Sequence, residues 1–137
     1  TEGSEQTVKK YAGEQIIFTG HRQDIASVLK RMDIFVLPSY SEGLPNALME
    51  AMAVGLAPLS SRVGGATVLI AEGKNGLFFR PGDRAELQEK LEYLIENEAP
   101  RKRLGAAAKL IASDFDLDKE IKKLIEVLGT HGSNQPL

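Results

Sequence analysis

The 137-residue chain contains no cysteine and no tryptophan, and it has only two histidines. Without cysteine, neither a disulfide scaffold nor a cysteine-ligated metal site can form. His21 and His131 lie far apart in the sequence and are a poor start for a metal centre, so no metal is expected. The formal net charge of −2 argues against broad attraction to phosphates, and therefore against a nucleic-acid partner.

Long apolar runs are also missing. No segment approaches the ~20 apolar residues of a membrane span. The first ten residues, TEGSEQTVKK, lack the apolar stretch of a signal peptide. With 42% hydrophobic and 26% charged residues, the composition is ordinary for a soluble globular protein of one domain. We therefore expect a cytoplasmic setting, at most peripheral at the inner membrane face.

The most informative stretch is residues 34–55, IFVLPSYSEGLPNALMEAMAVG. Residues 34–37 form a continuous apolar run, as expected of a strand that is buried on both faces. A polar loop follows, and Pro45 occupies the position that favours the first residue of a helix. Good helix formers continue to residue 53, and Gly55 supplies the stop. The stretch predicts a strand, a loop and a helix.

This helix start suits an anion, because its free N–H groups carry a partial positive charge. Gly43 removes a side chain from the loop, so a ligand can approach the backbone closely. Glu50 lies one turn beyond Asn46 on the same helix face, and Glu42 lies on the loop. Together these residues predict a site for an anion with neighbouring hydroxyl groups.

The remaining chain alternates strands with helices, which predicts an α/β fold with a parallel, Rossmann-like sheet. We expect strands at 16–18, 57–60 and 76–79, and helices at 4–12, 25–32, 66–72, 84–95, 100–111 and 116–128. Asp24 and Asp83 are expected to cap their helices, Asp83 in a capping-box pattern with Glu86. Gly64 and Gly65 are interpreted as turn residues. Residues 1–128 form the domain, with a helical C-terminal part, and residues 129–137 a tail.

The segment Glu42-Gly-Leu-Pro-Asn-Ala-Leu-Met-Glu50 resembles the E-x7-E signature of group 1 retaining glycosyltransferases of the GT-B fold. Four further segments agree in order and spacing: residues 17–20, 33–39, 63–65 and 72–78. The resemblance covers about residues 4–128. It implies a nucleotide-sugar donor as substrate, no separate cofactor and no metal.

The resemblance also assigns roles to residues. Glu42 would bond the transferred sugar beside its reacting carbon, and Glu50 would hold the ribose hydroxyls of the nucleotide. The loop and helix start would meet the sugar and the diphosphate, and residues 20–22 would receive the base, although Arg22 could instead approach a phosphate. The expected donor-binding residues are therefore Gly43, Leu44, Pro45, Asn46, Ala47, Leu48, Glu50, Gly20, His21 and Arg22, with Glu42 as the catalytic residue.

The chain departs from the family pattern at its start. The first two strands of the donor domain are not matched, nor are an arginine and a lysine that neutralise the leaving diphosphate. Residues 16–20 would then lose the neighbours that join them to residues 34–37. Either these two strands pair directly in a rearranged sheet, or a second chain covers the gap, because open strand edges invite pairing. The second alternative predicts a homo-oligomer.

We therefore expect the donor-binding part of a retaining glycosyltransferase, which passes a hexose-type sugar to a glycan or lipid acceptor held by another domain. This part alone is expected to be inactive. Two alternatives remain open: a non-catalytic nucleotide-binding or interaction module, and a nucleotide-sugar epimerase of GT-B architecture. A glycosidase pair of carboxylates ranks lower, since eight helical residues span ~12 Å and such pairs lie ~5–9.5 Å apart.

Overall fold

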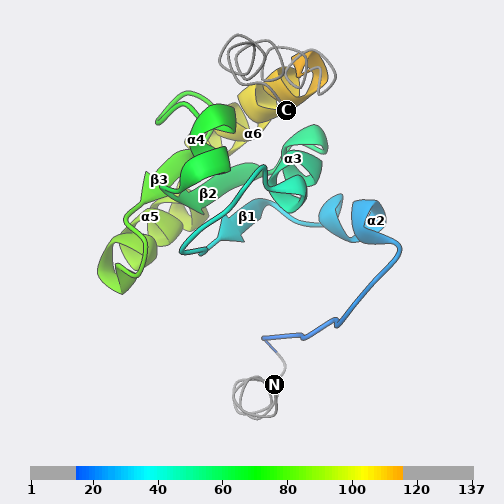
Figure 1. Cartoon of the computed structure of the whole chain (residues 1–137), viewed down its shortest axis with the longest axis horizontal. Helices are drawn as coiled ribbons and strands as arrows, with labels where there is room; N and C mark the ends of the chain where they lie inside the picture. The colour runs from blue at the N-terminus through cyan, green and yellow to red at the C-terminus, as the bar shows by residue number, and fades with distance from the viewer. Residues whose placement is uncertain (1–14, 116–137) are drawn as a thin grey trace, which may run out of the picture.

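The computed structural model describes residues 15–115, which form a three-stranded parallel sheet with helices on both faces (Figure 1). The elements in chain order are α2 (Ile25–Leu29), β1 (Ile34–Leu37), α3 (Asn46–Ala53), β2 (Ala57–Ser61), α4 (Gly64–Leu69), β3 (Leu77–Phe79), α5 (Arg84–Glu96) and α6 (Glu98–Asp114). The predicted α/β class and parallel Rossmann-like sheet are confirmed. The expected helices at 4–12 and 116–128 and the tail lie outside the described residues.

The sheet order is β1-β2-β3, with β2 in the centre. Ile34 is paired with Ala57, and Leu59 with Leu77, so the register brings the carboxyl ends of all three strands to one edge. Every residue of β2 is buried, as expected for a strand with a neighbour on each side. This edge is where the loops that follow β1 and β2 meet, and it carries the candidate site.

The core has two parts because alternate strand residues point to opposite faces of the sheet. Phe35 and Leu37 of β1 pack on the side of α3 and α4, around fully buried Leu48 and Met52. Ile34 and Val36 pack on the side of α5. Helix α6 connects the two parts, since Leu104 belongs to the second cluster and Ala108 to the first.

Several predicted boundaries move by a few residues. Helix α3 begins at Asn46, with Pro45 as its N-cap, and Gly55 follows its end with a φ of 85°. Helix α2 ends at Leu29 rather than at residue 32, and α4 spans residues 64–69 rather than 66–72. The Asp83 side chain accepts from the Glu86 N–H at 2.9 Å, which confirms that cap. The prediction that the Asp24 side chain caps α2 is wrong, because that side chain accepts no hydrogen bond from the start of the helix.

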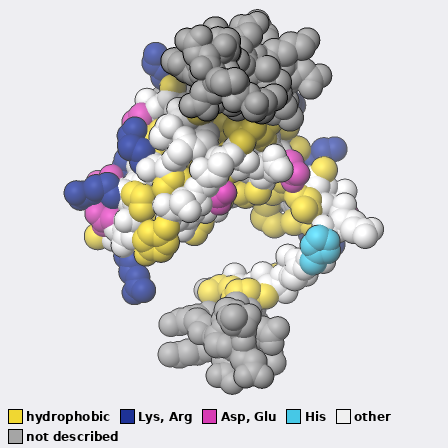
Figure 2. Space-filling model, in the orientation of Figure 1, with side chains coloured by type: hydrophobic (Ala, Val, Ile, Leu, Met, Phe, Trp, Pro, Cys, Tyr) yellow, Lys and Arg dark blue, Asp and Glu magenta, His cyan; other side chains and the backbone are white. Residues whose placement is uncertain are grey.

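The predicted strand at residues 16–18 is also wrong. Residues 16–20 form no strand, and they lead away from the sheet beyond α2 (Figure 1). Their apolar side chains are exposed, that of Ile17 to 79%, and Figure 2 shows hydrophobic groups on the segment that stands apart from the body. Direct pairing with β1 is therefore contradicted. A strand needs a hydrogen-bonded neighbour, and β-propensity alone does not supply one.

Within residues 15–115, no helix is both long enough and apolar enough to span a bilayer.

Candidate functional site

The loop of residues 38–45 leaves the carboxyl end of β1 and is fixed by the end of β2. Ser61, the last residue of β2, is fully buried. Its hydroxyl lies 3.1 Å from the Leu37 carbonyl oxygen and 2.5 Å from that of Ser39. The first residues of the loop are thereby fixed to the neighbouring strand beyond the last ladder pair of β1 and β2.

Glu42 lies on this loop and is half-buried. The Ser39 hydroxyl donates to its Oε1 at 2.6 Å, a short distance typical of a charge-assisted bond. The other carboxylate oxygen, Oε2, is not engaged by that bond. Glu42 can therefore still accept a hydrogen bond from an external hydroxyl group, as its predicted role requires.

Gly64 and Gly65 at the start of α4 lie directly against the Glu42 loop. A Cβ on Gly64 would lie 2.6 Å from the Glu42 carbonyl oxygen, and one on Gly65 would lie 1.6 Å from that of Gly43. The Gly65 N–H donates to the Glu42 carbonyl oxygen at 3.4 Å. Neither glycine has a positive φ. Our interpretation of them as turn residues is wrong, because the close backbone approach is what requires glycine here.

The start of α3 presents free amides to the same edge. The Met49 N–H bonds to the Pro45 carbonyl, so the amides of Asn46, Ala47 and Leu48 have no partner within the helix. Pro45 is buried and its side chain makes no capping bond. Asn46 and Ala47 are exposed, whereas the Leu48 side chain is fully buried. Leu48 has no exposed surface as a whole residue, so neither its side chain nor its amide is open to a ligand here.

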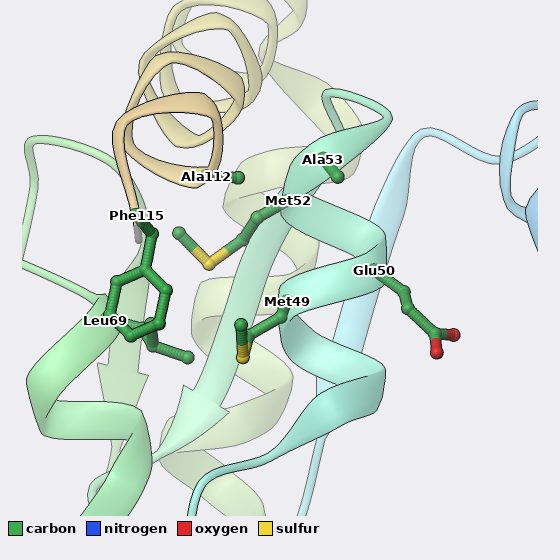
Figure 3. A pocket seen from close by; sticks show the side chains of 7 residues that line it. All are labelled: Met49, Glu50, Met52, Ala53, Leu69, Ala112 and Phe115. Carbon is green, nitrogen blue, oxygen red and sulfur yellow. The ribbon is translucent and has the colours of Figure 1, made fainter. Parts of the chain in front are cut away.

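Glu50 is exposed on α3 and points away from the apolar cavity behind it (Figure 3). That cavity, of about 230 Å³, is otherwise lined by apolar residues of α3, α4 and α6 and by Phe115. On its open side, Glu50 lines a groove of about 420 Å³ with Gln23, Ile25 and Ala26. The carboxylate is accessible to a polar ligand lying between α2 and α3.

Gly20, His21 and Arg22 are exposed and line a second groove beside α2, of about 260 Å³. Of its lining residues, only Ile25 also lines the groove of Glu50. The structure therefore does not bring this predicted base-binding segment into one cavity with Glu50.

Arg22 is also engaged. Its guanidinium donates to both carboxylate oxygens of Asp24, at 2.7 and 2.6 Å. The hydrogen bonds lower the pKa of the Asp24 carboxyl below its ordinary value and raise the pKa of Arg22. This pair explains why Asp24 does not cap α2, and it engages the arginine for which a phosphate contact is an alternative role.

Arg62 follows β2 at this edge, and its guanidinium also has partners. Its guanidinium lies 4.4 Å from the centre of the Phe78 ring and 3.6 Å from a Glu72 oxygen. In residues 15–115 no group of three or more His, Asp or Glu side chains is arranged to hold a metal ion. The chemistry on offer is that of carboxylates and backbone amides, which suits a ligand with hydroxyls and an anionic group.

Ser39, Ser61 and the packing role of Gly65 were not foreseen from the sequence. The only local signal was a pair of serines, Ser60 and Ser61, at the end of an otherwise apolar strand. A polar residue at the carboxyl end of a buried strand must find a partner, and here that partner is the backbone of the loop after β1.

A family model described as "Glycosyl transferases group 1" matches residues 3–111. Over 99 residues, the chain is 37% identical to N,N'-diacetylbacillosaminyl-diphospho-undecaprenol alpha-1,3-N-acetylgalactosaminyltransferase of Campylobacter jejuni. That alignment covers 72% of this chain and 26% of the enzyme. The chain spans about a quarter of the length of the curated relatives it matches.

Solved structures share the fold. HepE of Anabaena, in complex with UDP-glucose, has a TM-score of 0.78 at 26% identity, covering 94% of this chain and 36% of its own. The C-terminal domain of a glycosyl transferase group 1 family protein from Francisella tularensis has a TM-score of 0.68 at 25% identity. In that case the match covers 82% of this chain and 60% of the other.

Proposed function

Because the chain belongs to the group 1 glycosyl transferases and shares the fold of GT-B C-terminal domains, we propose that it carries a donor site for a nucleotide sugar. In the whole enzyme, a hexose-type sugar passes to a glycan or lipid acceptor with retention of its anomeric configuration. The observation that carries this proposal is the family match, which includes the whole segment from Glu42 to Glu50.

In this proposal, the two glutamates contact different parts of the donor. Glu42 accepts from hydroxyls of the transferred sugar through the carboxylate oxygen that Ser39 does not engage. Glu50 accepts from the two ribose hydroxyls, since one carboxylate can serve two neighbouring O–H donors. The diphosphate lies between them, at the amides of Asn46 and Ala47, where the helix start favours negative charge.

No resident cofactor or metal is needed in this proposal, because the nucleotide sugar is itself the substrate. The relative HepE was solved with UDP and with UDP-glucose, so these two molecules are the first ligands to test. The base preference of this chain is tested by comparing UDP with GDP and ADP in the calorimetric titration described below.

A specific observation favours a second candidate for this chain taken alone, a nucleotide-binding module without turnover. Stabilisation of a leaving diphosphate is commonly the largest catalytic contribution in such transfers. Arg62, which follows β2 at this edge, and Arg22, which precedes α2, are each engaged by a carboxylate. The charge for the leaving group then has to come from elsewhere in the whole enzyme.

Calorimetric titration of the full chain with UDP, GDP, ADP and their glucose conjugates tests the donor site. One nucleotide should bind saturably, and Glu50→Ala should weaken it at least about tenfold, as expected for charge-assisted bonds worth ~1.5–3 kcal/mol. Glu89→Ala, at an exposed position of α5, is the matched control and should bind as the wild type does. Absence of binding by a folded sample would contradict the proposal for this chain.

A separate assay addresses turnover. Incubation of the chain with the nucleotide sugar it binds, and with an acceptor, should release no nucleotide diphosphate if this chain is a binding module only. Release of nucleotide that depends on both Glu42 and an acceptor would instead show transfer by the chain itself.

A further inference from the structure

The Glu42 side chain is held by a series of contacts that begins in the sheet. Buried Ser61 bonds the backbone carbonyl of Ser39, and the Ser39 hydroxyl bonds the Glu42 carboxylate. The first bond fixes where the loop begins, and the second fixes the direction of the carboxylate. Because Ser61 is the last residue of the fully buried central strand, these two bonds link the orientation of Glu42 to the core of the sheet.

A third contact fixes the loop from the other side. The Gly65 N–H donates to the Glu42 carbonyl oxygen, and no side chain at position 65 could fit between the two backbones. Glu42 is thus held through both its carbonyl and its carboxylate, by α4 and by Ser39 respectively. Its neighbour Ser41, in contrast, is exposed, and no hydrogen bond of its hydroxyl is present in the described part of the chain.

A glutamate on an exposed loop normally samples several rotamers, and binding must then overcome that freedom. Here Oε1 is already occupied by the Ser39 hydroxyl, so the remaining lone pairs point in directions set by that bond. A ligand hydroxyl that meets Oε2 finds its acceptor in place. The resulting gain in affinity is confined to the part of the ligand that Glu42 contacts.

We propose that Ser39 is a positioning residue, which orients the Glu42 carboxylate for the sugar moiety of the donor. This inference rests on the proposed function, in which Glu42 faces the sugar and Glu50 and the α3 amides face the nucleotide. The inference predicts different effects on the binding of the two halves of the ligand. Ser39 affects affinity for the nucleotide sugar but leaves affinity for the free nucleoside diphosphate unchanged.

The test compares the dissociation constants of UDP-glucose and UDP, or of whichever pair binds, for the full chain and its variants. Ser39→Ala should reduce the preference for the sugar conjugate about fivefold, the effect of losing one hydrogen bond, with UDP binding unchanged. Ser39→Thr keeps a hydroxyl and should restore the preference. Ser41→Ala is the matched control and should have no effect.

A double-mutant cycle distinguishes positioning from a general effect on the loop. If Ser39 acts through the carboxylate, Ser39→Ala should change nothing further in a Glu42→Ala background. The fold should survive these changes, because the Ser39 carbonyl that Ser61 bonds belongs to the backbone. A thermal melt of each variant checks this.

The possible failures are distinct. If no nucleotide binds to the folded chain, the proposed function fails, and this inference fails with it. If UDP binds but the wild type shows no preference for the sugar conjugate, or if Ser39→Ala preserves that preference, the donor site stands and the positioning role of Ser39 is overturned. An equal loss for UDP and UDP-glucose in Ser39→Ala would likewise overturn it.

Discussion

Gly65→Ala should destabilise the protein, because the structure leaves no room for a side chain there. The added Cβ would lie 1.6 Å from the Gly43 carbonyl oxygen, 2.6 Å from the carbonyl carbon and 2.8 Å from Pro45 Cδ. Real Cβ atoms essentially never approach closer than 3.0 Å, so the two backbones must separate by about 1.4 Å. Two of the three obstructing atoms belong to the backbone, which no change of rotamer can relieve.

The size of the effect follows from two opposing contributions. Overpacking of this kind costs ~1–3 kcal/mol, and the separation also breaks the bond from the Gly65 N–H to the Glu42 carbonyl. Alanine gains up to ~1 kcal/mol over glycine within a helix, and less at position 65, the second residue of α4. We therefore expect a net loss of ~1–2 kcal/mol, or a fall in melting temperature of about 4–8 °C for a domain of this size.

The assay is thermal and urea unfolding followed by circular dichroism, with Gly43→Ala as the matched control. A Cβ at Gly43 meets no atom within 4 Å, and its φ is not positive, so that variant should stay within ~0.5 kcal/mol of the wild type. Amide shifts of residues 39 and 40 should move in Gly65→Ala but not in Gly43→Ala, since neither residue is a sequence neighbour of position 43. If Gly65→Ala is as stable as Gly43→Ala, the close approach of loop and helix is refuted.

Two further predictions concern the scaffold. Gly105→Ala in α6 should lower the urea midpoint by the equivalent of ~1–3 kcal/mol, because its Cβ would lie 2.2 Å from the Gly55 carbonyl oxygen; helix propensity alone predicts the opposite sign, so a raised midpoint would contradict the packing. Glu86 has a lowered pKa, chiefly because its carboxylate accepts the Arg80 backbone N–H at 2.7 Å and secondarily because Lys90 is near. Its stabilising effect is therefore fully present above the ordinary value of 4.5 and is lost as the pH falls through the lowered folded pKa. Between pH 7 and pH 3, the melting temperature of Glu86→Gln should fall less than those of the wild type and of a Glu89→Gln control. An equal fall in all three proteins would contradict the stabilising role of the Glu86 carboxylate.

Much of the fold could be predicted because its signals are local. The apolar run at 34–37, the helix formers after Pro45 and the stop at Gly55 all act within a few residues, and β1 and α3 appear where they indicate. Residues 16–18 carry an equally good local pattern, yet they form no strand. Whether an apolar segment becomes a strand depends on a hydrogen-bonded neighbour, and that neighbour is not a property of the segment.

The same distinction applies to the site. The sequence pointed to Glu42 and to the start of α3, because both lie in one short stretch. It could not show that Ser61 bonds residue 39, 22 positions away, or that Gly65 lies against Gly43. A pair of glycines is compatible with a turn and with a close approach alike, and only the φ angles and the neighbouring carbonyls decide between them.

The separation of the two grooves beside α2 has a consequence for the nucleotide base. Glu50 lines one groove with Gln23 and Ala26, whereas residues 20–22 line a neighbouring groove that shares Ile25 with it. No residue of α2 is buried, so little packing energy opposes its displacement. A ribose held by Glu50 and a base held by His21 therefore require either that the nucleotide spans both grooves or that α2 moves to join them. A His21→Ala variant tests this: unchanged affinity for the nucleotide that Glu50 binds would exclude His21 as its base contact, whereas a loss comparable to that of Glu50→Ala would show that the nucleotide reaches both grooves.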